Sequence, residues 1–218
     1  MPTTIALPPH AGEVALRRGA ALSEARLAVI MVHGRNAGPG NILELVPAID
    51  HPDAVYLAPA AKGGAWYPTS FLSPIEQNEP GISSGISVIH ALIDEVVESG
   101  IPAERIVLLG FSQGACLACT AAQQRPQRYG GVVVYSGGLI GPPGTTWSTD
   151  GSFDGTPVFF GCSNIDFHIP EKRVRDSAEH FARMGADVAM RIYEDMGHLV
   201  NDDEIAFTNA LLAGLARS

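Results

Sequence analysis

The sequence predicts an α/β fold in which a mostly parallel central sheet is flanked by helices on both faces. Short apolar runs rich in β-branched residues recur along the 218-residue chain and alternate with segments of helical spacing. These runs lack strict polar alternation, which is typical of strands covered on both faces. Hydrophobic residues make up 46% of the chain, enough to fill a sizeable core. We therefore expect residues 1–218 to form a single domain.

The first clear strand is expected at Leu27–Val32. Residues 1–26 precede it and leave room for one or two antiparallel edge strands, although Pro8 and Pro9 discourage sheet pairing there. Five later runs complete a set of six candidate strands: Ala54–Leu57, Arg105–Leu109, Gly131–Tyr135, Thr156–Phe160 and Val188–Tyr193.

Helices are expected between these strands. Apolar residues spaced 4, 3, 4 and 3 positions apart predict a helix after the second strand, and Gly100 and Pro102 end it. The apolar residues in this helix are Ile82, Ile86, Ile89, Ile93 and Val96. Helical patterns also cover 115–124 and 171–183, and His180 is expected on the solvated face of the latter. A closing helix starts with Asn201 as its N-cap and has acidic residues at 202–204 in its first turn.

Composition excludes several classes of partner. A formal charge of −9 argues against a nucleic-acid surface. The longest apolar runs have six residues, far below the roughly 20 needed to cross a bilayer, so no stable membrane insertion is expected. The first residues lack the basic and apolar regions of a secretory signal, and three cysteines suit reduced thiols. We expect a cytoplasmic protein without disulfides.

A serine motif lies at the centre of the chain. Gly110-Phe-Ser-Gln-Gly114 fits the pattern G-x-S-x-G and sits directly between a predicted strand and a predicted helix. A strand that turns abruptly into a helix has no room for side chains on either side of the serine, and glycine meets that need at both positions. This context predicts that Ser112 is a nucleophile at the carboxyl edge of the sheet.

A serine nucleophile needs a histidine base and an orienting acid. In this turn architecture the acid and the histidine follow the serine in the chain, and His198 lies in a glycine-containing loop after the last strand. Asp166 follows the preceding strand and is the predicted acid. Asp195 is the competitor, but its position three residues from His198 is unsuited to reaching the histidine Nδ1.

The oxyanion hole is expected to use two backbone N–H groups, one after the nucleophile and one from the loop after the first central strand. These are the N–H groups of Gln113 and Arg35. The side chain of Arg35 meets either an anionic substrate group or only solvent, and solvent is the simpler interpretation.

Five blocks in order resemble the α/β-hydrolase superfamily, and within it the phospholipase/carboxylesterase group that includes acyl-protein thioesterases. The blocks are Val32-His-Gly34, Ala65-Trp-Tyr67, Gly110-Phe-Ser-Gln-Gly-Ala115, Asp166-Phe-His-Ile-Pro170 and Met196-Gly-His-Leu-Val200. The resemblance runs from about Leu27 onward and implies the same five residues: Ser112, Asp166, His198, Arg35 and Gln113. This chain has Asn36 where family members commonly carry a second glycine.

The resemblance also implies that Trp66 and Tyr67 line an acyl or alcohol pocket, with core packing as the alternative for both. Phe71 and Leu72 belong to the same loop and would add an apolar wall. Cys116 and Cys119 form C-x-x-C within a helix, so buried structural cysteines are expected there. No spacing typical of a metal site is present, and we expect neither a metal nor a cofactor.

These observations lead to the hypothesis of a serine carboxylesterase that cleaves small to medium acyl esters or thioesters through an acyl-enzyme intermediate. Its expected partner is a small-molecule ester or thioester, and a homodimer is compatible with the sequence. Two alternatives remain open. One is a dienelactone-hydrolase-like enzyme acting on lactones or aromatic esters, although such enzymes usually carry cysteine in place of serine. The other is a catalytically silent binding protein with the same fold.

Overall fold

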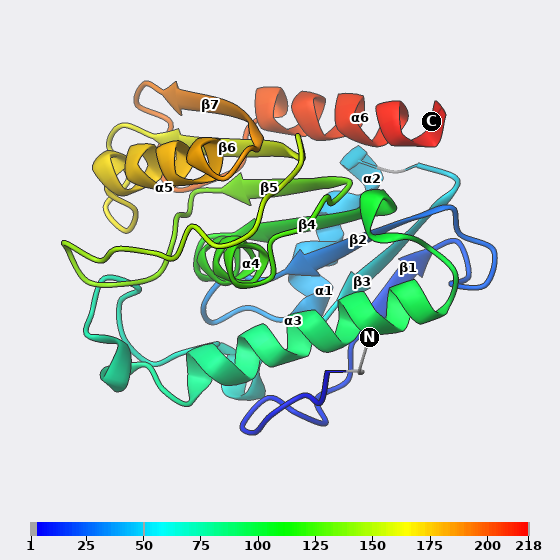
Figure 1. Ribbon diagram of the computed structural model, residues 1–218, viewed down its shortest axis with the longest axis horizontal. Coiled ribbons are helices and arrows are strands. Elements are labelled where there is room, and N and C mark those ends of the chain that lie inside the picture. The colour runs from blue at the N-terminus through cyan, green and yellow to red at the C-terminus, as the bar shows by residue number, and fades with distance from the viewer. Residues whose placement is uncertain (1–3, 50, 218) are drawn as a thin grey trace.

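The computed structural model describes residues 4–49 and 51–217, and its elements alternate between strands and helices along the chain (Figure 1). The strands are β1 (Leu16–Gly19), β2 (Leu27–Val32), β3 (Ala54–Ala58), β4 (Ile106–Phe111), β5 (Gly131–Tyr135), β6 (Pro157–Ser163) and β7 (Asp187–Tyr193). The α-helices are α1 (Pro39–Ile42), α2 (Val46–Ile49), α3 (Gly81–Glu98), α4 (Gln113–Gln124), α5 (Glu171–Arg183) and α6 (Asp202–Arg217). Short 3₁₀ turns are η1 (Leu43–Leu45), η2 (Lys62–Gly64), η3 (Ile75–Gln77) and η4 (Ala103–Arg105).

The strands form one sheet in the order β1-β3-β2-β4-β5-β6-β7. All neighbouring pairs are parallel except β1 and β3, which run antiparallel with Leu16 opposite Ala58. The predicted, mostly parallel sheet is therefore confirmed, and the segment before Leu27 contributes one antiparallel edge strand. Parallel strands end at one edge of the sheet, so the loops that follow β2, β4, β6 and β7 meet there.

The sheet separates two hydrophobic clusters because successive side chains of a strand point to opposite faces. In β2, Ala28, Ile30 and Val32 belong to the cluster that includes residues of α3, α4 and α5, whereas Leu27, Val29 and Met31 belong to the cluster that includes residues of α1, α2 and α6. Every residue of β2 is fully buried. This two-sided burial explains why the strand sequence shows no polar alternation.

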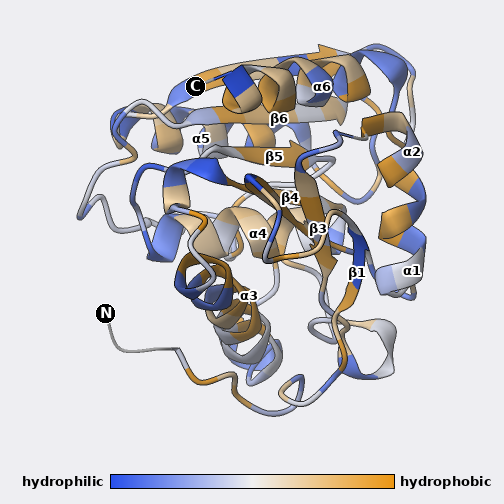
Figure 2. Cartoon of the chain, turned by 90° about the vertical axis from the view of Figure 1, so that its right-hand side faces the viewer, coloured by the Kyte–Doolittle hydropathy of each residue, from blue (hydrophilic) through white to orange (hydrophobic). Residues whose placement is uncertain are grey.

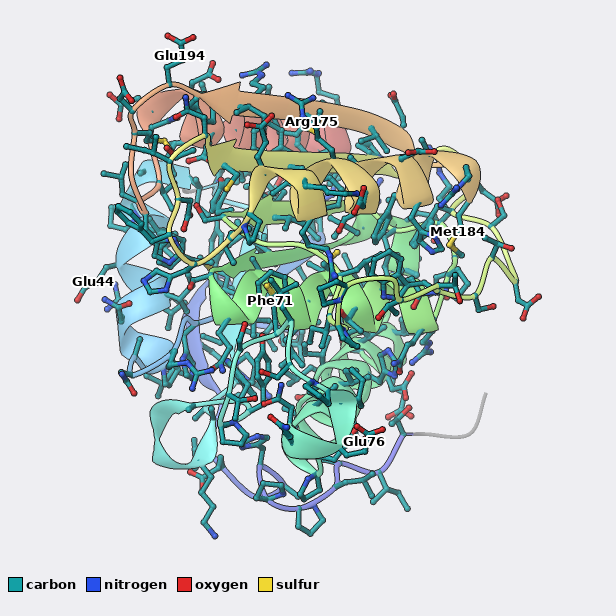
Figure 3. All side chains as sticks on the ribbon, turned by 90° about the vertical axis from the view of Figure 1, so that its left-hand side faces the viewer. Glu44, Phe71, Glu76, Arg175, Met184 and Glu194 are labelled. Atoms are coloured by element: carbon teal, nitrogen blue, oxygen red, sulfur yellow. The ribbon has the colours of Figure 1, made fainter. Side chains whose placement is uncertain are left out.

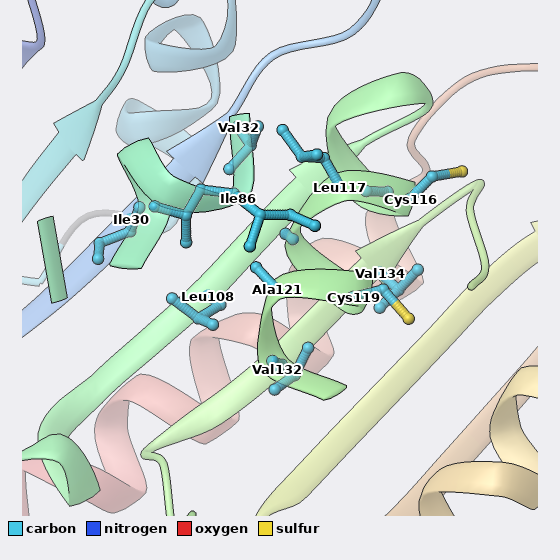
Figure 4. Packing of buried hydrophobic residues seen from close by; sticks show 14 of the residues in the cluster. Ile30, Val32, Ile86, Leu108, Cys116, Leu117, Cys119, Ala121, Val132 and Val134 are labelled. Carbon is cyan, nitrogen blue, oxygen red and sulfur yellow. The ribbon is translucent and has the colours of Figure 1, made fainter. Parts of the chain in front are cut away.

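The first of these clusters includes the residues with which α4 packs against the sheet. Leu117 and Ala121 of α4 face strand residues such as Leu108, and Ile86 of α3 closes the cluster from the side (Figure 4). The most hydrophobic strands, including β3 and β4, lie inside the shell of helices (Figure 2). Gly85 allows the close approach of the two helices, because a Cβ at this position would lie 2.7 Å from Leu117.

Two differences from the sequence-based expectations have clear physical reasons. Strand β6 continues three residues beyond the predicted Phe160, to Ser163, because β7 pairs with it along this whole length. The prediction for His180 was wrong: its side chain is only 1% exposed and packs edge-on against Trp147 at 5.6 Å, because the long loop after β5 covers this face of α5. Within the described residues, no helix combines the length and apolarity needed to span a membrane.

Candidate active site

Ser112 sits in a tight turn between β4 and α4. Its backbone adopts φ 56° and ψ −121°, and its N–H donates to the carbonyl of Tyr135 at 2.9 Å. Gly110 and Gly114 are sterically required, since a Cβ would lie 2.5 Å from the Gly114 oxygen in the first case and 2.1 Å from the Val32 oxygen in the second. This strained turn holds the serine side chain at the carboxyl edge of the sheet.

The structure brings three of the predicted site residues together in one chain of hydrogen bonds. The Nε2 atom of His198 lies 2.8 Å from Ser112 Oγ, and its Nδ1 atom lies 2.6 Å from Asp166 Oδ2. His198 occupies the loop between β7 and α6, which Gly197 fixes by donating its N–H to Ser163 Oγ at 3.1 Å. This arrangement allows the histidine to accept the serine proton while the carboxylate holds the ring in place.

Asp166 is held by its own loop after β6. Its Oδ1 atom accepts the backbone N–H groups of His168 at 2.8 Å and Ile169 at 3.1 Å. Burial alone would raise the pKa of Asp166, but the hydrogen bonds from His198 and from these two N–H groups outweigh burial and lower the pKa below its ordinary value. The carboxylate therefore stays ionised beside the histidine.

The competing acid is placed elsewhere. Asp195 is exposed, has a positive φ of 53°, and donates its N–H to Asn164 Oδ1 at 3.0 Å. The Nδ1 atom of His198 is instead occupied by Asp166. The geometry therefore favours Asp166 as the orienting acid.

Two backbone N–H groups flank the serine as candidate oxyanion donors. Gln113 is the first residue of α4, so its N–H has no partner within the helix. The neighbouring loop turns at Asn36, whose φ of 57° suits asparagine and whose N–H donates to Gly64. In the described part of the chain, the backbone N–H of Arg35 donates to no protein acceptor.

The Gln113 side chain ties the serine turn to the loop after β3. Its Oε1 atom accepts the N–H of Trp66 at 2.9 Å, and its Nε2 atom donates to the carbonyl of Tyr67 at 2.8 Å. Nothing in the sequence pattern indicated this second role. The amide fixes one wall of the site relative to the nucleophile.

A cavity of about 600 Å³ opens above Ser112. It is lined by Gly34, Arg35, Asn36, Ala37, Asn41, Tyr67, Pro68, Thr69, Ser70, Phe71, Phe111, Ser112, Gln113, Cys116, His168, Ile169 and His198. Tyr67 and Phe71 thus line the cavity as expected, and Figure 3 labels Phe71, which overlies α4 in that view. Cys116 also lines it, and burial raises the pKa of this thiol to about 12, so it stays protonated.

Trp66 and Leu72, which the sequence also suggested for the pocket, are not among its lining residues. Trp66 is fully buried, and its indole N–H donates to the carbonyl of His33 at 2.9 Å. Leu72 packs against the core cluster between the sheet and α3. Both side chains therefore pack in or against the core cluster beneath the loop and do not line the cavity. His168, whose ring lies 4.9 Å from that of His198, is a lining residue that sequence reasoning did not single out.

Comparison with known proteins agrees with the fold. Residues 23–214 match the family model described as Phospholipase/Carboxylesterase. The chain is 30% identical over 222 residues to acyl-protein thioesterase 1 of Eremothecium gossypii, covering 90% of this chain and 93% of the relative. It is 27% identical to acyl-protein thioesterase 1 of Saccharomyces cerevisiae, with 87% and 93% covered.

Among solved structures, a phospholipase/carboxylesterase from Dyadobacter fermentans superposes with a TM-score of 0.89 at 33% identity, covering 95% of this chain and 99% of that one. The match with the family model spans nearly the whole sheet, from the strand before the Arg35 loop to the helix after His198. The chain therefore belongs to the phospholipase/carboxylesterase family of α/β-hydrolases and is an ester or thioester hydrolase.

Proposed function

We propose that this enzyme is a serine hydrolase that cleaves small to medium acyl esters or thioesters through an acyl-enzyme intermediate on Ser112. The observation that carries the proposal is the hydrogen-bond chain from Ser112 through His198 to Asp166 at the floor of the cavity. The names of the relatives, acyl-protein thioesterases and carboxylesterases, agree with this class of substrate.

In the first half of the reaction, Ser112 Oγ attacks the carbonyl carbon while His198 Nε2 takes the hydroxyl proton. The negative charge that develops on the carbonyl oxygen is stabilised by the N–H groups of Arg35 and Gln113, the latter at the positive end of α4. His198 then gives the proton to the departing alcohol or thiol, and the acyl group remains on Ser112.

In the second half, His198 takes a proton from water, which attacks the acyl carbon. His198 then returns this proton to Ser112 Oγ as the bond between the acyl carbon and Oγ breaks, and the carboxylic acid leaves. Asp166 keeps its charge throughout and stabilises the protonated imidazole. A cavity of about 600 Å³ falls within the usual range of small-molecule sites. Its partly polar lining suits a short or medium acyl chain better than a long one.

The test is hydrolysis of p-nitrophenyl esters from acetate to decanoate by the wild type and by Ser112→Ala. Loss of the nucleophile is expected to lower kcat by about 10⁶. Ser99→Ala, which removes an exposed hydroxyl at the end of α3, is the matched control and is expected to keep full activity. A fluorophosphonate probe should label the wild type and Ser99→Ala, but not Ser112→Ala.

Equal turnover by the wild type and Ser112→Ala would contradict the proposal. Failure of the folded wild type both to turn over any ester and to react with the probe would favour a binding protein instead. A rate optimum at acetate or butyrate would establish a short-chain esterase, and an optimum at hexanoate or octanoate would establish a medium-chain one. A rate that still rises at decanoate would contradict the assignment to small and medium chains.

A further inference from the structure

One wall of the cavity carries a guanidinium group without an acidic partner. Arg35 donates from Nη1 to the carbonyl of Pro68 at 2.7 Å and from Nη2 to the carbonyl of Thr69. Both acceptors are neutral. Within residues 4–49 and 51–217, no carboxylate lies at ion-pair distance from Arg35. Its positive charge is therefore not neutralised by the protein.

Several other arginines of this chain behave differently. Arg17 pairs with Glu95, Arg125 with Asp94, and Arg191 with Asp203. Other arginines, such as Arg18 and the buried Arg173, have no carboxylate partner either, but Arg35 is the only arginine among the described residues that line the cavity.

The lining of the cavity extends this charge pattern. None of its lining residues is an aspartate or glutamate. Asp166 lies nearby, but its side chain is fully buried and turned toward His198. The lining also includes the side-chain amides of Asn36 and Asn41, which are able to donate hydrogen bonds. A negatively charged group entering the cavity thus meets a cation and donors, and no like charge.

The guanidinium is also fixed in place. The two carbonyls that it contacts belong to the loop whose start Gln113 secures, and its central carbon lies 5.8 Å from the ring centre of Tyr67. A guanidinium has five N–H donors, and these two carbonyls use only part of that capacity. A planar donor group with spare N–H bonds is well suited to bind a carboxylate, because two parallel hydrogen bonds form without much loss of side-chain freedom.

We infer that the physiological substrate is an ester or thioester that carries a carboxylate group, and that the Arg35 side chain binds this carboxylate while Ser112 attacks the ester carbonyl. This inference rests on the proposed function, since it assumes that Ser112 reacts in this cavity. Arg35 then has two separate roles: its backbone N–H serves the oxyanion, and its side chain selects the substrate.

The experiment compares matched pairs of charged and neutral esters. For a carboxylate on the acyl side, mono-p-nitrophenyl glutarate is compared with p-nitrophenyl pentanoate, which has the same number of acyl carbons. For a carboxylate on the alcohol side, 4-carboxyphenyl butyrate is compared with 4-carbamoylphenyl butyrate. The ratio of kcat/KM for the charged ester to that for the neutral ester is measured in each pair, at low and high salt.

The wild type is expected to prefer the charged ester in one of the two pairs, and Arg35→Gln to lower that ratio by about 10-fold to 100-fold, as for hydrogen bonds to a charged group. The loss should appear mainly in KM. Arg35→Lys keeps the positive charge but lacks the planar pair of N–H donors, so its kcat/KM ratio should fall between those of the wild type and Arg35→Gln. Arg18→Gln, which removes an exposed arginine on the remote edge strand β1, is the control and should leave the ratio unchanged.

The outcomes separate this inference from the proposed function. If neutral esters are hydrolysed in a Ser112-dependent manner but Arg35→Gln leaves the ratio unchanged in both pairs, the carboxylate site is wrong and the serine mechanism stands. If Arg35→Gln lowers the rate of both members of a pair equally, Arg35 only supports the loop, and the inference is overturned. If no ester is turned over in a Ser112-dependent manner, both proposals fail.

Discussion

At the scale of single residues, the chemistry depends on which acid orients His198. Asp166→Asn replaces an acceptor with an amide that also donates, so the ring loses both its fixed tautomer and the charge that stabilises its protonated form. We expect kcat for ester hydrolysis to fall by about 10³ to 10⁴ with little change in KM, as for the equivalent change in serine proteases.

The matched control for this substitution is Asp195→Asn, because Asp195 is the nearby acid that the sequence left as a competitor. It is exposed and does not contact the histidine, so we expect wild-type rates. A larger loss in Asp195→Asn than in Asp166→Asn would refute the assignment of the acid.

A second prediction at this scale concerns Glu204, a fully buried carboxyl group at the start of α6. Its Oε2 atom accepts the N–H of Asn201, while its Oε1 atom is buried and has no hydrogen-bond partner. Burial, with a smaller contribution from Asp203, outweighs the Asn201 hydrogen bond and raises the pKa of Glu204 from 4.5 to about 7.

Because the folded state holds this proton more tightly than the unfolded chain, its contribution to stability is full below about pH 4.5 and is lost as pH rises toward 7 and beyond. Glu204→Gln removes this dependence. Its free energy of unfolding relative to the wild type should therefore rise by about 2 kcal/mol between pH 5.5 and pH 8. Urea unfolding at both pH values measures the difference, with Glu194→Gln, an exposed site, as the control. A difference that does not change with pH would contradict the shifted pKa.

The same residues show how far sequence reasoning reaches. Ser112, Asp166 and His198 could be predicted because chain order and strand ends restrict the candidates, and the structure places them within hydrogen-bond distance. Glu204 was expected in the first helical turn, but its burial depends on its contact with Gly161 of β6, where a Cβ would lie 2.1 Å from its Oε1. Such contacts between distant segments leave no signal in local spacing, which also explains why Trp66 was assigned to the pocket.

At the scale of elements, the turn between β4 and α4 around Ser112 is predicted to require glycine at position 114. Gly114→Ala would place a methyl group 2.1 Å from the Val32 oxygen in β2. A backbone atom in a central strand cannot move aside cheaply, so we expect a loss of about 3 kcal/mol or more in stability together with loss of esterase activity. Gly40→Ala in α1 is the control, because a Cβ there meets nothing within 4 Å. Thermal unfolding of the two variants distinguishes them, and equal melting temperatures would contradict the steric argument.

The bounds of some strands could be predicted from the sequence more accurately than those of others, and the solvent exposure of their side chains explains the difference. Strands β2, β4 and β5 were expected within one or two residues of their observed ends because nearly every side chain in them is buried and apolar. All four residues of β1 are exposed, and two of them are arginines. An edge strand that buries no side chain produces no apolar pattern, so only its general position could be expected.

At the scale of the whole molecule, the N-terminal segment reaches across the fold to support the active-site wall. His10 is only 2% exposed, and its N–H donates to Ser84 Oγ of α3 at 2.9 Å. Its Nδ1 atom accepts the N–H of Lys62, so its Nε2 atom carries the proton and donates to the carbonyl of Trp66. His10 thus links two parts of the fold: its backbone N–H binds α3, and its imidazole binds the loop that supplies Tyr67 and Phe71 to the cavity.

His10→Ala therefore leaves a backbone donor and a backbone acceptor in that loop without their partners. Each unsatisfied buried group costs about 1–3 kcal/mol, so we expect a fall in melting temperature of several degrees. KM for the preferred ester should also rise, because the wall formed by Tyr67 and Phe71 is no longer held. His51→Ala, which removes a single local contact with the N–H of Asp53, should leave KM unchanged. If His10→Ala matched the wild type in both melting temperature and KM, the N-terminal segment would have no part in shaping the site.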